Sequence, residues 1–141
     1  MSIKKYDELT NQEKLALVKF YPEEAKKDKN WLVRLQAYKI LGFTKDALKD
    51  EDSWVRQEAY NTLYKNLGFI KEALNNKDKY IRLEAYKNLG FTEEAFKDEY
   101  SVIRQEAYRN LGYTKEALND EDEYIRQEAK IYLDFIKSNK I

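Results

Sequence analysis

The sequence predicts an all-α protein: a right-handed α-solenoid of about five short, 22-residue two-helix repeats, with a capping helix at each end. The phrase Ile/Val-Arg-x-Glu/Gln-Ala-Tyr recurs five times, the last time with lysine for tyrosine, and its arginines lie 22, 26, 22 and 22 residues apart. A nearly fixed period of this length is typical of stacked units too small to bury an apolar face alone. Each phrase also has apolar residues at helical spacing, and a glycine follows four of the five.

The chain is expected to begin with a capping segment over residues 10–28. Thr10 and Glu13 form a capping box ahead of an amphipathic helix that contains Leu15 and Val18. Pro22, the only proline, then predicts the start of a degenerate short helix.

The longer helix of each repeat is predicted from a cap and an apolar stripe at i, i+4 and i+8, which lie on one helix face. The expected caps are Asn30, Asp52, Asp78 and Asp122, with Ser101 as the cap beside Tyr100. The stripes are Val33/Ala37/Leu41, Val55/Ala59/Leu63, Ile81/Ala85/Leu89, Ile103/Ala107/Leu111 and Ile125/Ala129/Leu133.

A shorter helix is expected after each glycine, because glycine readily adopts the left-handed conformation that ends a helix. Threonines at 44, 92 and 114 are the predicted caps of this second helix, and its apolar pairs are Ala47-Leu48, Ala73-Leu74, Ala95-Phe96 and Ala117-Leu118. At about two turns it would depend on stacking for its stability. The predicted repeats are 29–50, 51–76, 77–98 and 99–120, followed by a C-terminal cap over 121–141, all within a single domain over 1–141.

The second repeat has four additional residues near Tyr64. Four residues make about one helical turn, so the favoured interpretation is a neutral extension of the long helix, with Leu67 continuing the stripe beyond Leu63. The alternative is a ridge or bend that shapes a binding surface.

Composition excludes several classes of function. The 141 residues contain no cysteine or histidine, which excludes thiolate and imidazole metal sites, cysteine nucleophiles and histidine bases. No glycine loop for phosphate and no convergent catalytic set is recognisable, and the acidic loops lack the pattern of a calcium site, so we predict no enzymatic activity, no cofactor and no metal. The amino terminus is not a signal peptide and no apolar run reaches membrane-spanning length, which favours a cytoplasmic protein without a membrane partner. Enrichment in lysine, asparagine and tyrosine suggests a bacterial or phage source.

One repeat unit resembles a known family. The unit cap-Val-Arg-x-x-Ala-x-x-x-Leu-Gly, with an acid or amide six residues before the arginine, resembles HEAT-like repeats over about residues 10 to 137; the residues at that earlier position are Asp28, Asp50, Asn76, Asp98 and Asp120. Its short period is similar to the leucine-rich-repeat-variant branch. The resemblance implies that arginine and aspartate bond one another and tie repeat to repeat. The iron–sulfur module of some variant-repeat proteins needs cysteines and is not implied.

The predicted function is a non-enzymatic protein–protein interaction module, an adaptor or inhibitor that is a monomer when free. The alternative is binding of a DNA backbone through the arginine and lysine face of the helices, as in some HEAT-like proteins, although the net charge is zero.

Two kinds of position are candidates for the interface. Arginine and tyrosine at i and i+4 would form a row along the repeats, either as a structural tie or as an interface. Positions that vary between copies are the second kind, and the two tryptophans are either anchors for a partner or packing residues. The candidate partner-binding residues are Trp31, Trp54, Leu35, Leu83, Tyr38, Tyr60, Tyr64, Tyr86, Tyr108, Lys39, Lys87 and Arg109.

Overall fold

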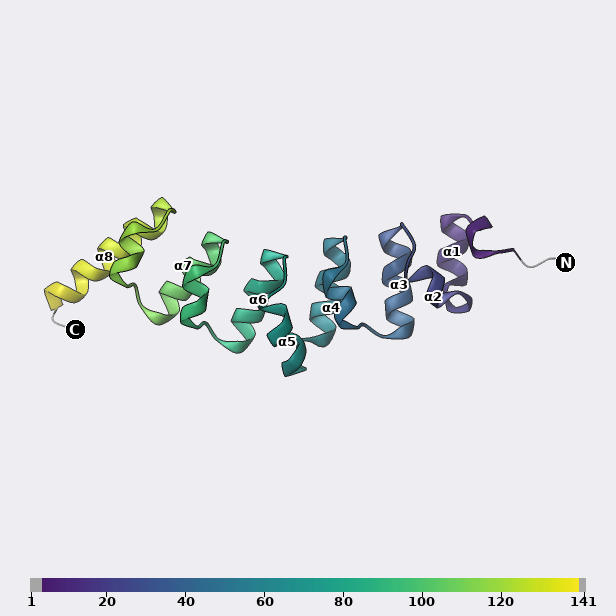
Figure 1. Cartoon of the computed structure of the whole chain (residues 1–141), viewed down its shortest axis with the longest axis horizontal. Helices are drawn as coiled ribbons and strands as arrows, with labels where there is room; N and C mark the ends of the chain where they lie inside the picture. Colours follow the sequence, from purple (N-terminus) through teal and green to yellow (C-terminus); the bar gives the residue numbers. More distant parts are fainter. Residues whose placement is uncertain (1–3, 140–141) are drawn as a thin grey trace. The chain divides into compact units, whose positions relative to one another are not determined.

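The computed structural model describes residues 4–139, and every regular element in that range is helical (Figure 1). This confirms the predicted all-α class. The α-helices are α1 (Asn11–Leu17), α2 (Pro22–Ala25), α3 (Trp31–Leu41), α4 (Ser53–Leu63), α5 (Leu67–Ala73), α6 (Lys79–Leu89), α7 (Ser101–Leu111) and α8 (Glu123–Asn139). Short 3-10 helices are η1 (Tyr6–Glu8), η2 (Val18–Phe20), η3 (Lys45–Lys49), η4 (Glu93–Lys97) and η5 (Lys115–Asn119). None of the described helices combines the length and apolar character needed to span a membrane.

The chain divides into two compact units, the first ending at Arg82 and the second beginning at Leu83, so that the division falls within α6. Each unit is described by itself below. The single domain and its repeat boundaries stay a prediction.

The helix starts follow the predicted caps with one exception. Thr10 and Glu13 form the capping box of α1, and Pro22 is the first residue of α2. Side-chain oxygens at the four predicted Asx positions accept backbone N–H groups of the following helix; these residues are Asn30, Asp52, Asp78 and Asp122. The prediction for Ser101 is wrong: Ser101 is the first residue of α7 and Tyr100 is its N-cap, without a side-chain bond.

The core consists of small residues, as the stripe predicted. The ten alanines at the predicted core positions are fully buried, and they are Ala25, Ala37, Ala47, Ala59, Ala73, Ala85, Ala95, Ala107, Ala117 and Ala129. The branched residue four positions before each long-helix alanine is also buried, from Val33 to Ile125. Because the side chain of alanine is only a methyl group, the helices can approach closely, and the branched residues fill the remaining space.

The leucine end of the stripe is exposed in three of the five long helices, contrary to prediction, while Leu63 and Leu133 are half-buried. Leu41 is 41% exposed and Leu111 is 49% exposed, and Leu89 is exposed too. The reason is a difference in length. A long helix of 11 residues, such as α3 or α7, measures about 16 Å, whereas a five-residue 3-10 helix, such as η4, measures about 10 Å. The short element therefore leaves the last turn of the long helix uncovered. Leu118 of the short helices is exposed as well.

The short elements differ from the predicted α-helices. η3, η4 and η5 are single 3-10 helices, and the threonine before each makes no capping bond through its side chain. The glycine before them does have positive φ, at Gly42, Gly90 and Gly112. Gly42 has φ 97° and ψ 142°, an extended conformation that essentially only glycine adopts, rather than the predicted left-handed helical one.

The four additional residues do not lengthen the long helix. α4 has 11 residues, the same number as α3, α6 and α7, and it ends at Leu63. A turn through Tyr64 follows, and the next element is then an α-helix, α5, in place of a 3-10 helix (Figure 1). Gly68 lies in the first turn of α5, so the prediction that it terminates a helix is also wrong. The side chain of Leu67 lies outside the described residues.

Candidate functional site

The arginine of the repeated phrase is a buried structural tie in two copies. Arg34 donates from Nε and Nη2 to the carboxylate of Asp50, at 2.9 and 2.7 Å. In the second unit, Arg104 bonds Asp120 in the same bidentate way, at 3.0 Å for both contacts. This confirms the arginine–aspartate bond that the family resemblance implied, because planar guanidinium matches two carboxylate oxygens at once.

The same guanidinium also holds the loop before its own helix. Nη1 of Arg104 donates to the carbonyl oxygens of Asp98 and Glu99, at 2.8 and 3.1 Å. Burial alone would raise the pKa of Asp120, but the bonds from Arg104 and from the Asp122 N–H outweigh it, and the pKa lies below its usual value. Asp120 therefore stays ionised, and two loops are fixed to one helix.

At the amino-terminal end of the described residues, the corresponding aspartate, Asp28, is bonded by a lysine and a tyrosine instead of an arginine. Lys14 Nζ lies 2.8 Å from Asp28, and the Tyr6 hydroxyl donates to the same carboxylate at 2.6 Å. Burial and the bond to Asp28 raise the pKa of Tyr6 above its ordinary value, so the phenol stays protonated.

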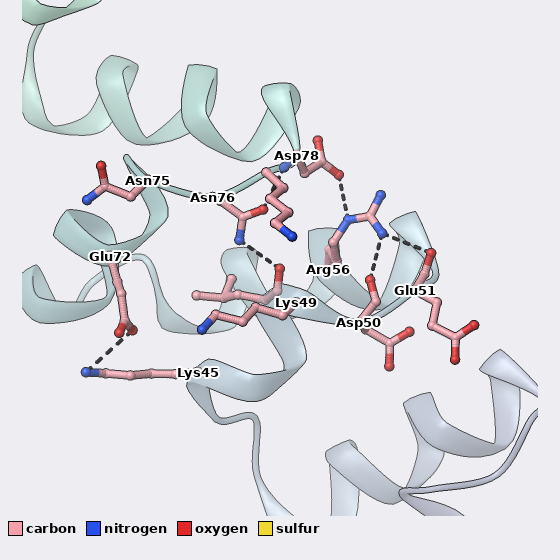
Figure 2. Close-up of a pocket in the computed structure, with 11 residues that line it drawn as sticks. Lys45, Lys49, Asp50, Glu51, Arg56, Glu72, Asn75, Asn76 and Asp78 are labelled. Carbon is pink, nitrogen blue, oxygen red and sulfur yellow. Dashed lines mark hydrogen bonds and ion pairs between the residues drawn. The ribbon is translucent and has the colours of Figure 1, made fainter. Parts of the chain in front are cut away.

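The second copy of the tie is irregular (Figure 2). The position of Asp50 and Asp120 is taken here by Asn76, whose Oδ1 accepts the Asp78 N–H while its Nδ2 donates to the Leu48 carbonyl at 2.8 Å. An amide nitrogen cannot accept a bond from arginine. Arg56 therefore bonds the next carboxylate along the chain, from Nε to Asp78 Oδ2 at 2.6 Å.

A cavity of about 730 Å³ lies at this irregular tie, within the first unit. Four basic and four acidic residues line it, together with Leu48 and two asparagines; the charged residues are Lys45, Lys49, Arg56, Lys77, Asp50, Glu51, Glu72 and Asp78. They come from η3, the start of α4, the end of α5 and the loop before α6 (Figure 2). The volume lies within the range of ligand-binding pockets.

The tyrosines of the phrase are packing residues. Tyr38, Tyr60, Tyr86 and Tyr108 are buried. Tyr38 stacks on Phe43 with ring centroids 5.6 Å apart, and Tyr108 stacks on Tyr113 at 5.3 Å. The aromatic residue after each of these long helices is thus a stacking partner for the tyrosine within the helix. The interpretation of the arginine–tyrosine row as an exposed interface is wrong for these four tyrosines.

The remaining candidate partner-binding residues differ in how exposed their side chains are. Leu35 and Leu83 are buried, so the prediction that they point outward is wrong. Tyr64 is exposed in the turn after α4. The three basic candidates, Lys39, Lys87 and Arg109, are exposed, but Arg109 also bonds Glu128 at 2.6 Å.

The tryptophans lie at helix starts with their side chains exposed. Trp54 is 65% exposed at the second residue of α4, and Trp31 is 39% exposed at the first residue of α3. Tyr80 and Tyr124 hold the same position as Trp54 in α6 and α8, where they are 55% and 71% exposed. The remaining two copies have Leu32 and Val102 there. This position varies between copies, whereas the residue that follows it is a buried valine or isoleucine each time.

Glu128 is a hub of polar contacts in the second unit. It accepts hydrogen bonds from Gln105, Arg109 and Tyr113. The bond from Arg109 is the largest cause of a lowered pKa at Glu128, while burial and the bond to Glu128 raise the pKa of Tyr113. These groups satisfy one another, and the arrangement offers no free acid or base.

Sequence reasoning missed two features of the site. Asn76 was visible as the only amide in a series of aspartates, and that substitution signals an arginine without its usual partner. Tyr80 and Tyr124 are aromatic residues at the same position as Trp54, which varies between copies, so the sequence could have indicated them in the same way. Within residues 4–139, no group of three or more His, Cys, Asp and Glu side chains is placed to hold a metal ion.

Comparison with known protein families, with curated proteins and with solved structures found no match to this chain.

Proposed function

We propose that this chain is a non-enzymatic protein-binding module. Its short, HEAT-like repeats stack in this proposal as a right-handed α-solenoid. The period of the phrase supports the stacking, because Arg34 and Arg104 each bond the aspartate that ends their own predicted repeat, in the loop that leads into the next copy. The proposed setting is cytoplasmic, in a bacterium or phage, with the free protein a monomer.

The observation that carries the binding function is Trp54, a tryptophan that is 65% exposed at the start of α4, the helix that contributes Arg56 to the cavity. Tryptophan, tyrosine and arginine are the residue types most enriched at interface hot spots. Burying a large aromatic side chain contributes about 1.5–3 kcal/mol, and an exposed tryptophan leaves that free energy to a partner. Trp31 and Tyr80 add two further exposed aromatics at helix starts in the same unit.

A second feature supports a protein partner over a nucleic acid. The buried arginines already bond carboxylates, and the exposed Arg109 bonds Glu128. These arginines are therefore occupied within the fold, whereas binding to a phosphate backbone depends on uncompensated cations.

The test compares capture of proteins from a bacterial lysate by the wild type, Trp54→Ala and Tyr124→Ala. Tyr124 is the matched control, because it is exposed at the same helix position in the other unit. Once a captured protein is purified, titration calorimetry should show that Trp54→Ala weakens its affinity by about 30-fold, as for an interface hot spot. Tyr124→Ala should leave affinity unchanged.

Loss of affinity in Tyr124→Ala alone would place the interface elsewhere. Steeply salt-dependent binding to DNA or RNA, without any protein partner, would replace the proposal with the nucleic-acid alternative.

A further inference from the structure

Arg56 has a guanidinium nitrogen that no group within the described residues bonds. Its Nε bonds Asp78, and its Nη1 bonds the carbonyl oxygens of Asp50 and Glu51 at 2.7 and 3.0 Å. Nη2, which bonds the aspartate in Arg34 and Arg104, has no acceptor here among the described residues, and Figure 2 draws no bond from it.

Asp78 contacts Arg56 through one oxygen only. Its Oδ1 accepts the Tyr80 N–H at 2.8 Å at the start of α6, and its Oδ2 accepts the Nε–H of Arg56 at 2.6 Å. The Arg56 side chain is accordingly 21% exposed, against 8% for Arg34 and 7% for Arg104. Both N–H groups of Nη2 are thus left to water or to a ligand.

The cavity contains more unpaired positive than negative charge. Lys49 and Lys77 both line it, and no described acid pairs with either. Three of the four lining acids are paired: Asp50 with Arg34, Asp78 with Arg56, and Glu72 with Lys45. Glu51 is the only described lining acid whose side chain has no cation within the ion-pair distance in this unit.

We propose that this cavity binds the carboxylate of an aspartate or glutamate in an extended peptide segment, through Nη2 of Arg56 together with Lys49 and Lys77. Charge-assisted hydrogen bonds from guanidinium to carboxylate are among the strongest in proteins. A doubly charged phosphate fits less well, because the carboxylates of Glu51, Asp50 and Asp78 line the same cavity.

The surroundings suit a peptide rather than a free acid. The side chain of Asn75 lines the cavity, has no partner among the described residues, and can bond a peptide backbone. Trp54 and Tyr80 are exposed at the second residue of α4 and of α6, and the cavity residues Glu51 and Asp78 lie just before these two helices. The inference rests on the proposed protein-binding function and specifies the chemistry of the partner.

The test uses the full chain labelled with ¹⁵N and a blocked peptide of alternating glycine and glutamate, at low ionic strength. The matched peptide has glutamine in place of glutamate, and inorganic phosphate is the third probe. The glutamate peptide should shift the Arg56 Nε–H signal and the amides of Lys49 and Lys77, and the glutamine peptide should not. Lys49→Gln with Lys77→Gln should weaken binding, by up to about fivefold for each lysine.

The control pair is Lys65→Gln with Lys71→Gln, which changes the net charge equally at exposed positions outside the cavity. A second variant, Asn76→Asp, restores the aspartate of the regular copies, and its carboxylate should compete for Arg56 and weaken peptide binding.

Four results would overturn the inference: equal binding of the two peptides, equal weakening by the control pair, unchanged affinity in Asn76→Asp, or phosphate shifting the same signals at the same concentration as the glutamate peptide. Capture of a protein through Trp54 without any binding of the glutamate peptide would overturn this inference alone. Binding of the glutamate peptide without capture of any protein through Trp54 would overturn only the proposed function.

Discussion

Replacing Arg104 by methionine should strongly destabilise the second unit. Methionine keeps an apolar stem in place but removes four hydrogen bonds, two to Asp120 and two to the carbonyls of the preceding loop. The side chains of Arg104 and Asp120 are each only 7% exposed, so the substitution leaves a buried carboxylate without its cation. Removing one partner of a buried ion pair costs about 3–5 kcal/mol.

The last copy of the phrase provides a matched control. Arg126 is exposed, and within the described residues its side chain donates to a single carbonyl, that of Asp120, at 2.7 Å. Arg126→Met should therefore cost no more than about 1–1.5 kcal/mol, the net contribution of one hydrogen bond.

Urea unfolding followed by far-ultraviolet circular dichroism measures both variants against the wild type. Helical stacks can lose two-state behaviour, so the midpoint and the slope are compared together. Equal losses for Arg104→Met and Arg126→Met, or a loss below about 1 kcal/mol for Arg104→Met, would refute the interpretation of the arginine as a buried tie.

Three further predictions concern acid, glycine and leucine. The pKa of Asp120 is lower in the folded protein than the ordinary aspartate pKa of 3.8, so its ionised side chain stabilises the fold fully above pH 3.8, and this stability is lost as pH falls through the folded pKa. Urea titrations in that acid range should show that the free energy of unfolding depends less on pH in Arg104→Met than in the wild type. Gly42→Ala should cost about 1–3 kcal/mol, because φ is 97°, whereas Gly68→Ala in α5 should cost far less; thermal unfolding compares the two. Ile103→Ala should cost about 2–5 kcal/mol and Leu111→Ala less than about 1.5 kcal/mol, since only Ile103 is fully buried; equal costs in urea unfolding would contradict the uncovered last turn.

The sequence predicted those features that depend on local spacing. The Asx caps and the buried alanine and branched positions follow from helical periodicity, and the structure has them where the pattern put them. The buried arginine–aspartate bond at Arg34 came from the family resemblance, since no local rule pairs residues 16 positions apart.

Features that depend on relative lengths were not predictable from spacing. Leu41 is exposed because the short element that follows it, η3, forms a 3-10 helix. The helix propensities of five residues do not distinguish a 3-10 helix from an α-helix, so the sequence could not predict this. For the four additional residues the sequence favoured a helix extension, because one extra turn would continue the apolar stripe, but the structure has a turn there. Their outcome depended on Asn66, which caps α5 by accepting the Gly68 N–H.

The site was recognised only in part. Trp54 was found because it varies between copies, but Leu35 varies as well and is buried. Variation alone does not distinguish an exposed position from a core position that tolerates leucine or glutamine. The unpaired nitrogen of Arg56 required the coordinates, because the sequence does not show that Arg56 bonds Asp78 through Nε alone.

The central claim is that the repeated phrase holds the fold together while the varied residues around the irregular tie bind a partner. Hydrogen–deuterium exchange of the chain, with and without a captured protein, tests it most directly. Amides at helix starts bond side-chain caps such as Asp52 and Asp78 in place of intrahelical carbonyls, and in the free protein they should exchange faster than amides in the helix interior. We predict that the partner slows exchange over residues 50–56 and 75–81 and leaves residues 120–126 of the second unit unchanged. Slowed exchange at 120–126 without any change at 50–56 would contradict the account.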